Sequence, residues 1–163
     1  GWWNGKSSSE DYRGKFYKCL GQTIIEIDNL HEYYPLLDNL FKYPYKVEQE
    51  FMMDKEDKTE YDKLKDWVTV YRGYNIRFDH GKENRKRYRS GWSWTTDKKI
   101  AEKFARRNGT MWATEGKCYV AEGQVAKEQI ISYFTGRDES EVFINPRIIN
   151  IKNEIEIELE KGK

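Results

Sequence analysis

The spacing of hydrophobic residues changes near residue 66 and divides the chain into two parts. Residues 11–65 favour helices, because Tyr12, Phe16 and Leu20 recur at the spacing of one helical face. A short charged helix is expected over 54–65. After residue 66 the apolar residues alternate with polar ones or gather in β-branched and aromatic runs, which is typical of strands. This pattern predicts strands over 67–71, 92–94, 117–125, 129–134 and 141–144.

Two further elements complete the second part of the chain. A helix begins at Asp97, and we expect Thr96 to cap it and Ile100, Ala101 and Phe104 to form its buried stripe. The chain then ends in a strand over 149–160, in which isoleucines alternate with glutamates. This alternation predicts a half-buried strand with one solvated acidic face.

The order of these elements predicts an α+β protein with helices first and strands afterwards. An N-terminal tail and helical region over 1–65 precedes a mostly antiparallel β core over 66–163, which contains one inserted helix. A length of 163 residues suits a single compact domain. Hydrophobic residues make up only 37% of the chain, but 15% are aromatic and bury a large area each, so a core is still expected.

Composition and charge exclude several classes of function. The 29 Lys and Arg residues nearly balance the 28 Asp and Glu residues, so the net charge of +1 does not favour binding to nucleic acid or membranes. Two distant cysteines and two distant histidines do not form a metal motif or a disulfide framework. No apolar run approaches ~18 residues, and residues 1–10 lack the apolar core of a secretory signal. We therefore expect a cytoplasmic protein, of the producing cell or of a target cell.

The first segment that carries candidate chemistry is the end of the strand over 67–71. Arg72 shares a strand face with Val68 and Val70, because side chains alternate along a strand. An arginine in this position favours a paired anion, and its planar fork suits phosphate or carboxylate. Gly73 leaves room for close approach of a ligand to the backbone. On this segment alone, an arginine in a structural ion pair is the favoured interpretation.

Two other segments carry hydroxyls and carboxylates. Ser93 and Thr95 lie on one face of a strand that leads directly into the helix. Their hydroxyls and the backbone N–H groups are therefore expected close to the N-terminus of that helix, which carries a partial positive charge. Glu139 and Glu141 point the same way, roughly 7 Å apart, if both lie in one strand. Two carboxylates at that distance can act on two ends of one reacting system. The structural alternatives are simple helix capping and a solvated acidic face like that of the last strand.

Taken in order, these segments resemble the R-S-E class of ADP-ribosyltransferases, which includes cholera-like toxins and arginine-specific transferases. The motifs read YRG at 71–73, SWT at 93–95 and ESE at 139–141. The resemblance covers residues 66–150 and extends to the helix after the serine motif. In its general character the sequence is similar to the small bacterial or phage-encoded members of this class. It implies two roughly perpendicular β sheets with NAD, a consumed substrate, in the cleft between them, and no metal.

The resemblance also implies roles for the residues that bind NAD. Arg72 is expected to hold the pyrophosphate or the adjacent ribose, and the backbone of Gly73 to bind the nicotinamide carboxamide. Ser93 is expected to brace the site near Glu141, with Thr95 as the second hydroxyl of the motif.

The remaining implied roles concern the reaction and its target. Glu141 is expected to bind the ribose 2′-OH and to stabilise the oxocarbenium ion that forms as nicotinamide departs. Glu139 is expected to orient and deprotonate the nucleophile, and a glutamate in this position favours a protein arginine as acceptor. Tyr133 and Phe134 are expected to contact the target.

Other functions stay open at this point. The same site could hydrolyse NAD as a glycohydrolase, and an inactive version of the fold is a further alternative. The basic segment 79–90 mixes arginines and lysines with Tyr88, as modules that bind single-stranded nucleic acid do. The ordinary interpretation of that segment is a solvated loop between the first two motifs, which contacts the target.

Overall fold

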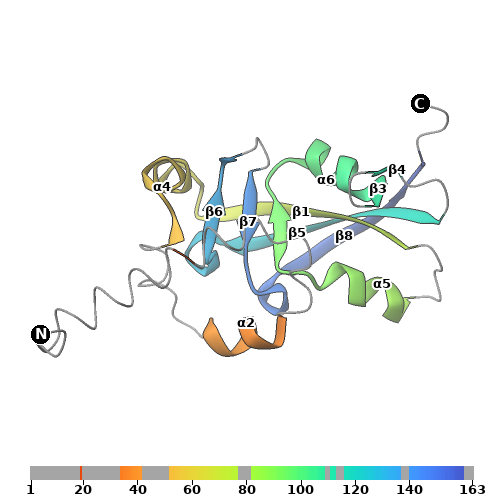
Figure 1. Cartoon of the computed structure of the whole chain (residues 1–163), viewed down its shortest axis with the longest axis horizontal. Helices are drawn as coiled ribbons and strands as arrows, with labels where there is room; N and C mark the ends of the chain where they lie inside the picture. The colour runs from red at the N-terminus through yellow and green to blue at the C-terminus, as the bar shows by residue number, and fades with distance from the viewer. Residues whose placement is uncertain are drawn as a thin grey trace, which may run out of the picture.

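The computed structural model describes residues 19, 34–41, 52–76, 82–108, 111–112, 116–136 and 140–159 (Figure 1). The helices among these residues are α2 (Tyr34–Leu40), α4 (Lys55–Asp62), α5 (Lys82–Arg89) and α6 (Lys98–Ala105), with short 3-10 turns at Lys127–Gln129 and Pro146–Ile148. The strands are β1 (Trp67–Ile76), β2 (Ser93–Thr95), β3 (Arg107–Asn108), β4 (Met111–Trp112), β5 (Lys117–Ala126), β6 (Ser132–Phe134), β7 (Glu141–Phe143) and β8 (Asn150–Ile157). The α+β prediction is therefore confirmed, whereas the predicted tail over 1–10 and most of the first predicted helix lie outside the described residues.

Six of the strands form one antiparallel sheet with the order β6-β7-β2-β1-β5-β8, and β3 pairs with β4 separately. The sheet consists of two blocks. In Figure 1, β6, β7 and β2 run up and down the view, whereas β1, β5 and β8 run across it. In the described part of the chain the two blocks share one register pair, Tyr71 opposite Thr95, whereas β1 and β5 pair along their whole length. From Arg72 to Ile76, β1 therefore has no strand partner on its β2 side among the described residues.

The two faces of β1 explain how the sheet is covered. Val68, Val70 and Ile76 are fully or nearly fully buried on one face, as the alternation predicts. On the opposite face α6 packs so closely that a Cβ atom on Gly73 would lie 1.7 Å from the carbonyl oxygen of Ala101. Only a glycine allows this approach, so Gly73 is required for the packing of α6 against the sheet.

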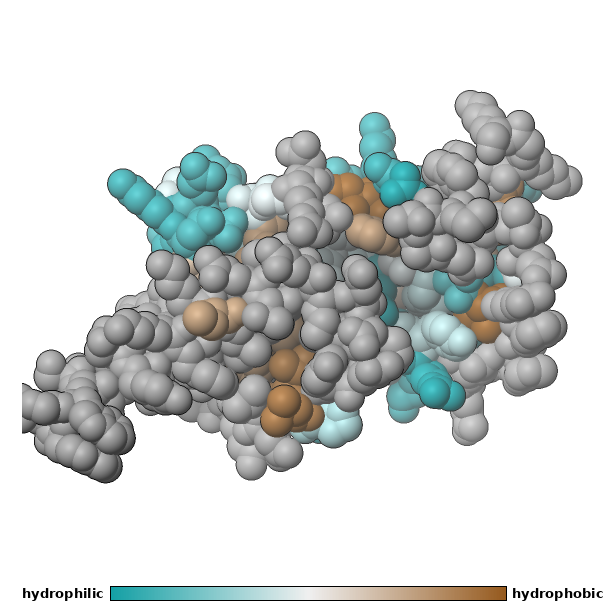
Figure 2. All heavy atoms as spheres, viewed as in Figure 1, coloured by the Kyte–Doolittle hydropathy of each residue, from teal (hydrophilic) through white to brown (hydrophobic). Residues whose placement is uncertain are grey.

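The two described helices of the N-terminal region, α2 and α4, both pack against the sheet. Leu37 and Phe41, from α2 and the residue that follows it, join Trp92 and Phe143 in one apolar cluster. The helix α4 is held at β6 by Asp57, whose carboxylate accepts hydrogen bonds from the backbone N–H and the hydroxyl of Thr135 at 2.9 and 2.8 Å. Figure 2 shows the hydrophilic side chains that cover the outer side of α4.

Several local predictions are wrong in detail. The inserted helix is capped by Asp97, which accepts from the N–H of Lys99, rather than by Thr96. Phe104 is 46% exposed instead of buried, because α6 meets the sheet through Ala101 and Ala105. Apolar surface is accordingly visible on α6 in Figure 2.

The basic segment and the last strand also differ from expectation. Residues 82–89, predicted to be a loop, form α5. In β8 the solvated acidic face was predicted to include Glu154, but its side chain is only 17% exposed, whereas Ile155 is 41% exposed. The reason is tertiary, since α5 covers the Glu154 side of this edge strand. No helix among the described residues is long and apolar enough to cross a membrane.

Candidate functional site

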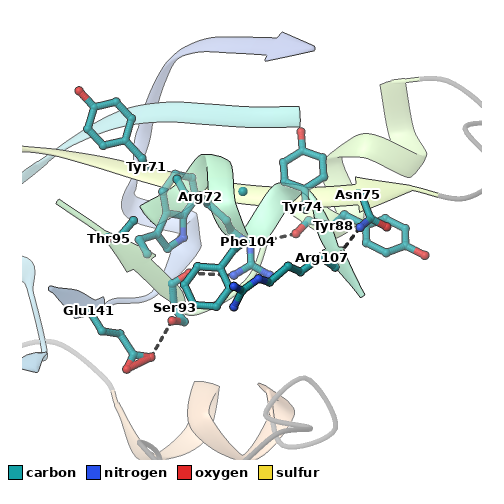
Figure 3. A pocket seen from close by; sticks show the side chains of 13 residues that line it. Tyr71, Arg72, Tyr74, Asn75, Tyr88, Ser93, Thr95, Phe104, Arg107 and Glu141 are labelled. Carbon is teal, nitrogen blue, oxygen red and sulfur yellow. Dashed lines mark hydrogen bonds between the residues drawn. The ribbon is translucent and has the colours of Figure 1, made fainter. Parts of the chain in front are cut away.

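A cavity of about 360 Å³ opens beside the unpaired edge of β1 (Figure 3). Its volume lies within the range of about 300–1,000 Å³ that is typical of small-molecule sites. The side chains and backbone that line it come from two helices and four strands: Tyr71, Arg72, Gly73, Tyr74, Asn75, Tyr88, Ser93, Trp94, Thr95, Ala101, Phe104, Arg107 and Glu141. The cavity thus contains Arg72, Gly73, Ser93, Thr95 and Glu141, which the sequence singled out as a set.

Arg72 is held in the cavity by backbone carbonyls. Its Nη1 donates to the carbonyl of Ser93 at 2.7 Å, and its Nε donates to the carbonyl of Tyr88 at 3.0 Å. The guanidinium lies against Gly91, where an added Cβ atom would come within 2.2 Å of Cζ. The absence of a side chain at Gly91 therefore makes the space that Arg72 occupies.

The charge of Arg72 is not neutralised by any of the described residues around it. No carboxylate among the described residues lies within ion-pair distance of its guanidinium, so the structural ion pair considered from the sequence is not found there. Burial lowers the pKa of Arg72, and the nearby Tyr34 and Tyr74 hydroxyls oppose that shift. A desolvated cation bonded only to neutral groups is a favourable partner for an anion that enters the cavity.

Ser93 links the arginine to the carboxylate of the third motif. Its carbonyl accepts from Arg72, and its hydroxyl donates to Oε1 of Glu141 at 2.6 Å, as the dashed lines in Figure 3 show. The strand register makes this possible, because β2 pairs with β7 and sets Thr95 opposite Glu141. The side chain of Glu141 is partly exposed to the cavity. Residues separated by 69 positions in the sequence thus meet through one serine.

The backbone turns sharply just before Glu141. Ser140 has φ of 45°, in the left-handed region that residues other than glycine rarely adopt. Its carbonyl accepts from the N–H of Thr96 at 3.2 Å, which ties this turn to the start of the inserted helix. The strand therefore begins at Glu141, and the alternation used to place Glu139 on the same face does not extend back through Ser140. Glu139 itself lies outside the described residues.

Thr95 and Gly73 both have structural tasks in addition to their place at the cavity. The Thr95 hydroxyl accepts from the N–H of Asp97 at 3.1 Å and so shapes the turn into α6. Gly73 faces α6 as described above, while its backbone belongs to the open edge of β1. The sequence predicted that a ligand approaches the backbone of Gly73 closely, whereas the close approach that the structure shows is that of the helix α6.

Tyr133 and Phe134 do not agree with a role in gripping a target. They are only 7% and 2% exposed, because they lie in β6 of the sheet, where Tyr133 and Phe134 each join a different buried apolar cluster. The Tyr133 hydroxyl lies 3.2 Å from that of Thr96 and is engaged inside the protein. The aromatic side chains that a ligand or target can reach at the cavity are Tyr88 and Phe104, which are 44% and 46% exposed.

The sequence placed Phe104 in the core and named Tyr88 only as part of the basic segment, so neither was predicted to line this cavity. Phe104 fits the apolar stripe of α6, and only the arrangement of that helix on the sheet turns it outward. Tyr88 was assigned to a loop. Arg107 also lines the cavity, and its carbonyl accepts from the Asn75 side chain at 2.9 Å.

The cations of the basic segment are partly engaged within the protein. Arg85 and Arg89 pair with Glu154 at 3.3 and 2.9 Å, so they do not form a row that points away from the protein. This arrangement weakens the argument for a module that binds nucleic acid.

No cluster of three or more potential metal ligands occurs among the residues described. Comparisons with protein-family models, curated proteins and solved structures give no match for this chain.

Proposed function

We propose that the protein is a mono-ADP-ribosyltransferase of the R-S-E class, which transfers ADP-ribose from NAD to a protein arginine and releases nicotinamide. The observation that carries this proposal is the connection Arg72–Ser93–Glu141 in one cavity. The Arg72 guanidinium, which pairs with no carboxylate in the part of the chain that the structure describes, and the Glu141 carboxylate are held at a set separation by the carbonyl and the hydroxyl of the same serine. This arrangement suits a substrate with an anionic group at one end and a developing cation at the other.

The construction of the sheet supports the same proposal. The described strands form one six-stranded sheet rather than two sheets, and we propose that its two three-stranded blocks, joined at Tyr71 and Thr95, correspond to the two sheets implied by the resemblance. The open edge of β1 lies where these blocks diverge, and it presents backbone donors and acceptors to the cavity. A planar carboxamide can pair with such an edge in the way a further strand would.

In the proposed reaction, the Arg72 guanidinium binds the pyrophosphate of NAD, and Glu141 accepts a hydrogen bond from the 2′-OH of the nicotinamide ribose. The bond between C1′ of that ribose and the nicotinamide nitrogen breaks, and its electron pair leaves with nicotinamide. The positive charge moves from the nicotinamide ring to the ribose as this bond breaks, so the fixed carboxylate of Glu141 beside the ribose stabilises the oxocarbenium ion more than the ground state. Ser93 keeps the carboxylate in position, which lowers the cost of reorganisation during the reaction.

The acceptor completes the reaction. A guanidinium nitrogen of the target forms the new bond to C1′ and loses a proton, for which Glu139 is the proposed base. Arginine is a poor nucleophile while fully protonated, so this proton transfer is required. Water in place of the acceptor would give ADP-ribose, the glycohydrolase reaction.

The test is the release of nicotinamide from NAD by the purified protein, with and without an arginine-rich acceptor. We expect wild-type protein to release nicotinamide, Glu141→Gln to lose release with and without acceptor, and Glu128→Gln, an exposed carboxylate away from the cavity, to behave as wild type. Labelled ADP-ribose on the acceptor would support transfer, and free ADP-ribose alone would support hydrolysis. Absence of release by wild type in both conditions would refute the proposal.

A further inference from the structure

The helix α5 is held to the sheet mainly by charged groups. Its sequence, KENRKRYR, contains one aromatic residue, Tyr88, and that residue is 44% exposed at the cavity. Such a helix has no apolar face to bury, so hydrophobic packing contributes little to its position. Its location beside the cavity therefore needs another explanation.

Glu154 of β8 supplies this anchor. Its carboxylate, 17% exposed, pairs with Nε of Arg85 at 3.3 Å and with Nη1 of Arg89 at 2.9 Å. It also accepts a hydrogen bond from the Tyr74 hydroxyl. Arg85 and Arg89 are four positions apart and so lie on one face of the helix, where both reach the same carboxylate. The Arg85 guanidinium also lies 5.5 Å from the centre of the Tyr119 ring, a cation–π contact that adds to the anchor.

The last turn of α5, which carries Arg89, also touches the site. Arg72 and Glu154 lie opposite the same residue of β5, Ala121, so they occupy one row across three neighbouring strands. At the Arg72 end of this row, the carbonyl of Tyr88 accepts from Nε of Arg72 at 3.0 Å. The last turn of α5 thus connects Glu154 at the sheet edge with the guanidinium in the cavity.

We infer that Glu154 is a positioning residue, which sets the place of α5 and through it the orientation of Arg72 and the affinity of the cavity for its anionic ligand. The inference rests on the proposed function for the identity of that ligand. Without the carboxylate, the like charges of Arg85 and Arg89 repel each other, and both side chains lose their pair with Glu154 in a partly buried position. The carbonyl of Tyr88 then no longer holds a constant position beside Arg72.

The variant that tests this is Glu154→Gln, and Glu156→Gln is its matched control. Glu156 lies on the same face of β8 but is 53% exposed, and its pair with Lys117 is on the surface, where such pairs contribute little. We expect Glu154→Gln to raise the KM for NAD about tenfold, within the usual range of coupling between two sites, while kcat changes little. Glu156→Gln should match wild type. Amide hydrogen exchange over residues 82–90 should become faster only in Glu154→Gln.

A second variant separates positioning from a general loss of folding. Arg89→Gln removes the helix side of the pair and leaves β8 unchanged, so it should reproduce the rise in KM and the faster exchange. If wild-type protein turns over NAD and Glu154→Gln has an unchanged KM, the inference is wrong. If wild type does not act on NAD, the proposed function fails, and unchanged exchange in α5 of Glu154→Gln would then overturn the anchoring role as well.

Discussion

The space that Gly91 leaves for Arg72 gives the sharpest test of the site. In Gly91→Ala the new Cβ atom would lie 2.2 Å from both Cζ and Nη2 of Arg72. Ordinary contact between carbon atoms is about 3.5 Å, so the guanidinium must retreat by roughly 1.3 Å. Because the atoms that must move are at the end of a flexible side chain, the fold can accept the substitution while the site cannot.

The size of the effect follows from the two hydrogen bonds that hold the guanidinium. At 2.7 and 3.0 Å these bonds tolerate a lengthening of only about 0.5–0.8 Å before they are lost. A hydrogen bond to a charged group contributes about 1.5–3 kcal/mol. We therefore expect Gly91→Ala to weaken ligand binding by about 2 kcal/mol, or roughly thirtyfold in Kd.

The assay is calorimetric titration with ADP-ribose, which keeps the pyrophosphate and is not cleaved. Gly136→Ala is the control, because a Cβ atom there meets nothing within 4 Å. Both variants should keep the unfolding temperature of wild type to within a few degrees, and only Gly91→Ala should bind weakly. Equal affinity of Gly91→Ala and wild type would show that the position of Arg72 does not determine binding.

Four further predictions follow from the same contacts. Gly73→Ala should lower the unfolding temperature strongly, since its Cβ atom would lie 1.7 Å from a backbone oxygen of α6 and overpacking costs about 1–3 kcal/mol or more; an unchanged melting curve would contradict this. Ser93→Ala removes the 2.6 Å hydrogen bond to the site carboxylate, so kcat for nicotinamide release should fall about tenfold at unchanged stability. Asp57→Ala leaves the donors of Thr135 unpaired, and urea unfolding should show a loss of about 1–3 kcal/mol, with a smaller loss in Asp57→Asn. Burial, and then the hydrogen bond to a carboxylate, raise the pKa of Tyr74 above its ordinary value of 10.0. The free energy of unfolding should therefore fall as the pH rises above about 10, because only the unfolded chain releases this proton there. Tyr74→Phe should make the free energy of unfolding fall less steeply with pH.

Local patterns were sufficient for the elements that carry the site. The alternation of Val68 and Val70 predicted both the strand and the face on which Arg72 lies. The small hydroxyl residues before Asp97 predicted a strand that leads into a helix, as β2 and α6 do. These features depend on a few neighbouring residues, whose side-chain directions follow from backbone geometry alone.

Burial at the edges of the structure could not be predicted in the same way. Glu154 and Glu156 have the same local pattern, yet one lies beneath α5 and the other faces solvent. Phe104 fits a buried stripe but is exposed, and Phe134 looks like a surface contact but is 2% exposed. In each case the outcome depends on which distant element packs against the residue, and the local sequence does not contain that information.

The sequence was sufficient to name the candidate residues of the site and their order along the chain, because residue type and strand periodicity are local properties. Only the tertiary structure decided that Ser93 joins Arg72 to Glu141, since this requires the pairing of β2 with β7 and the divergence of β2 from β1. It likewise decided that Gly91 makes room for the guanidinium and that Glu154 anchors α5. These contacts join segments far apart in the chain, and folding alone brings them within bonding distance.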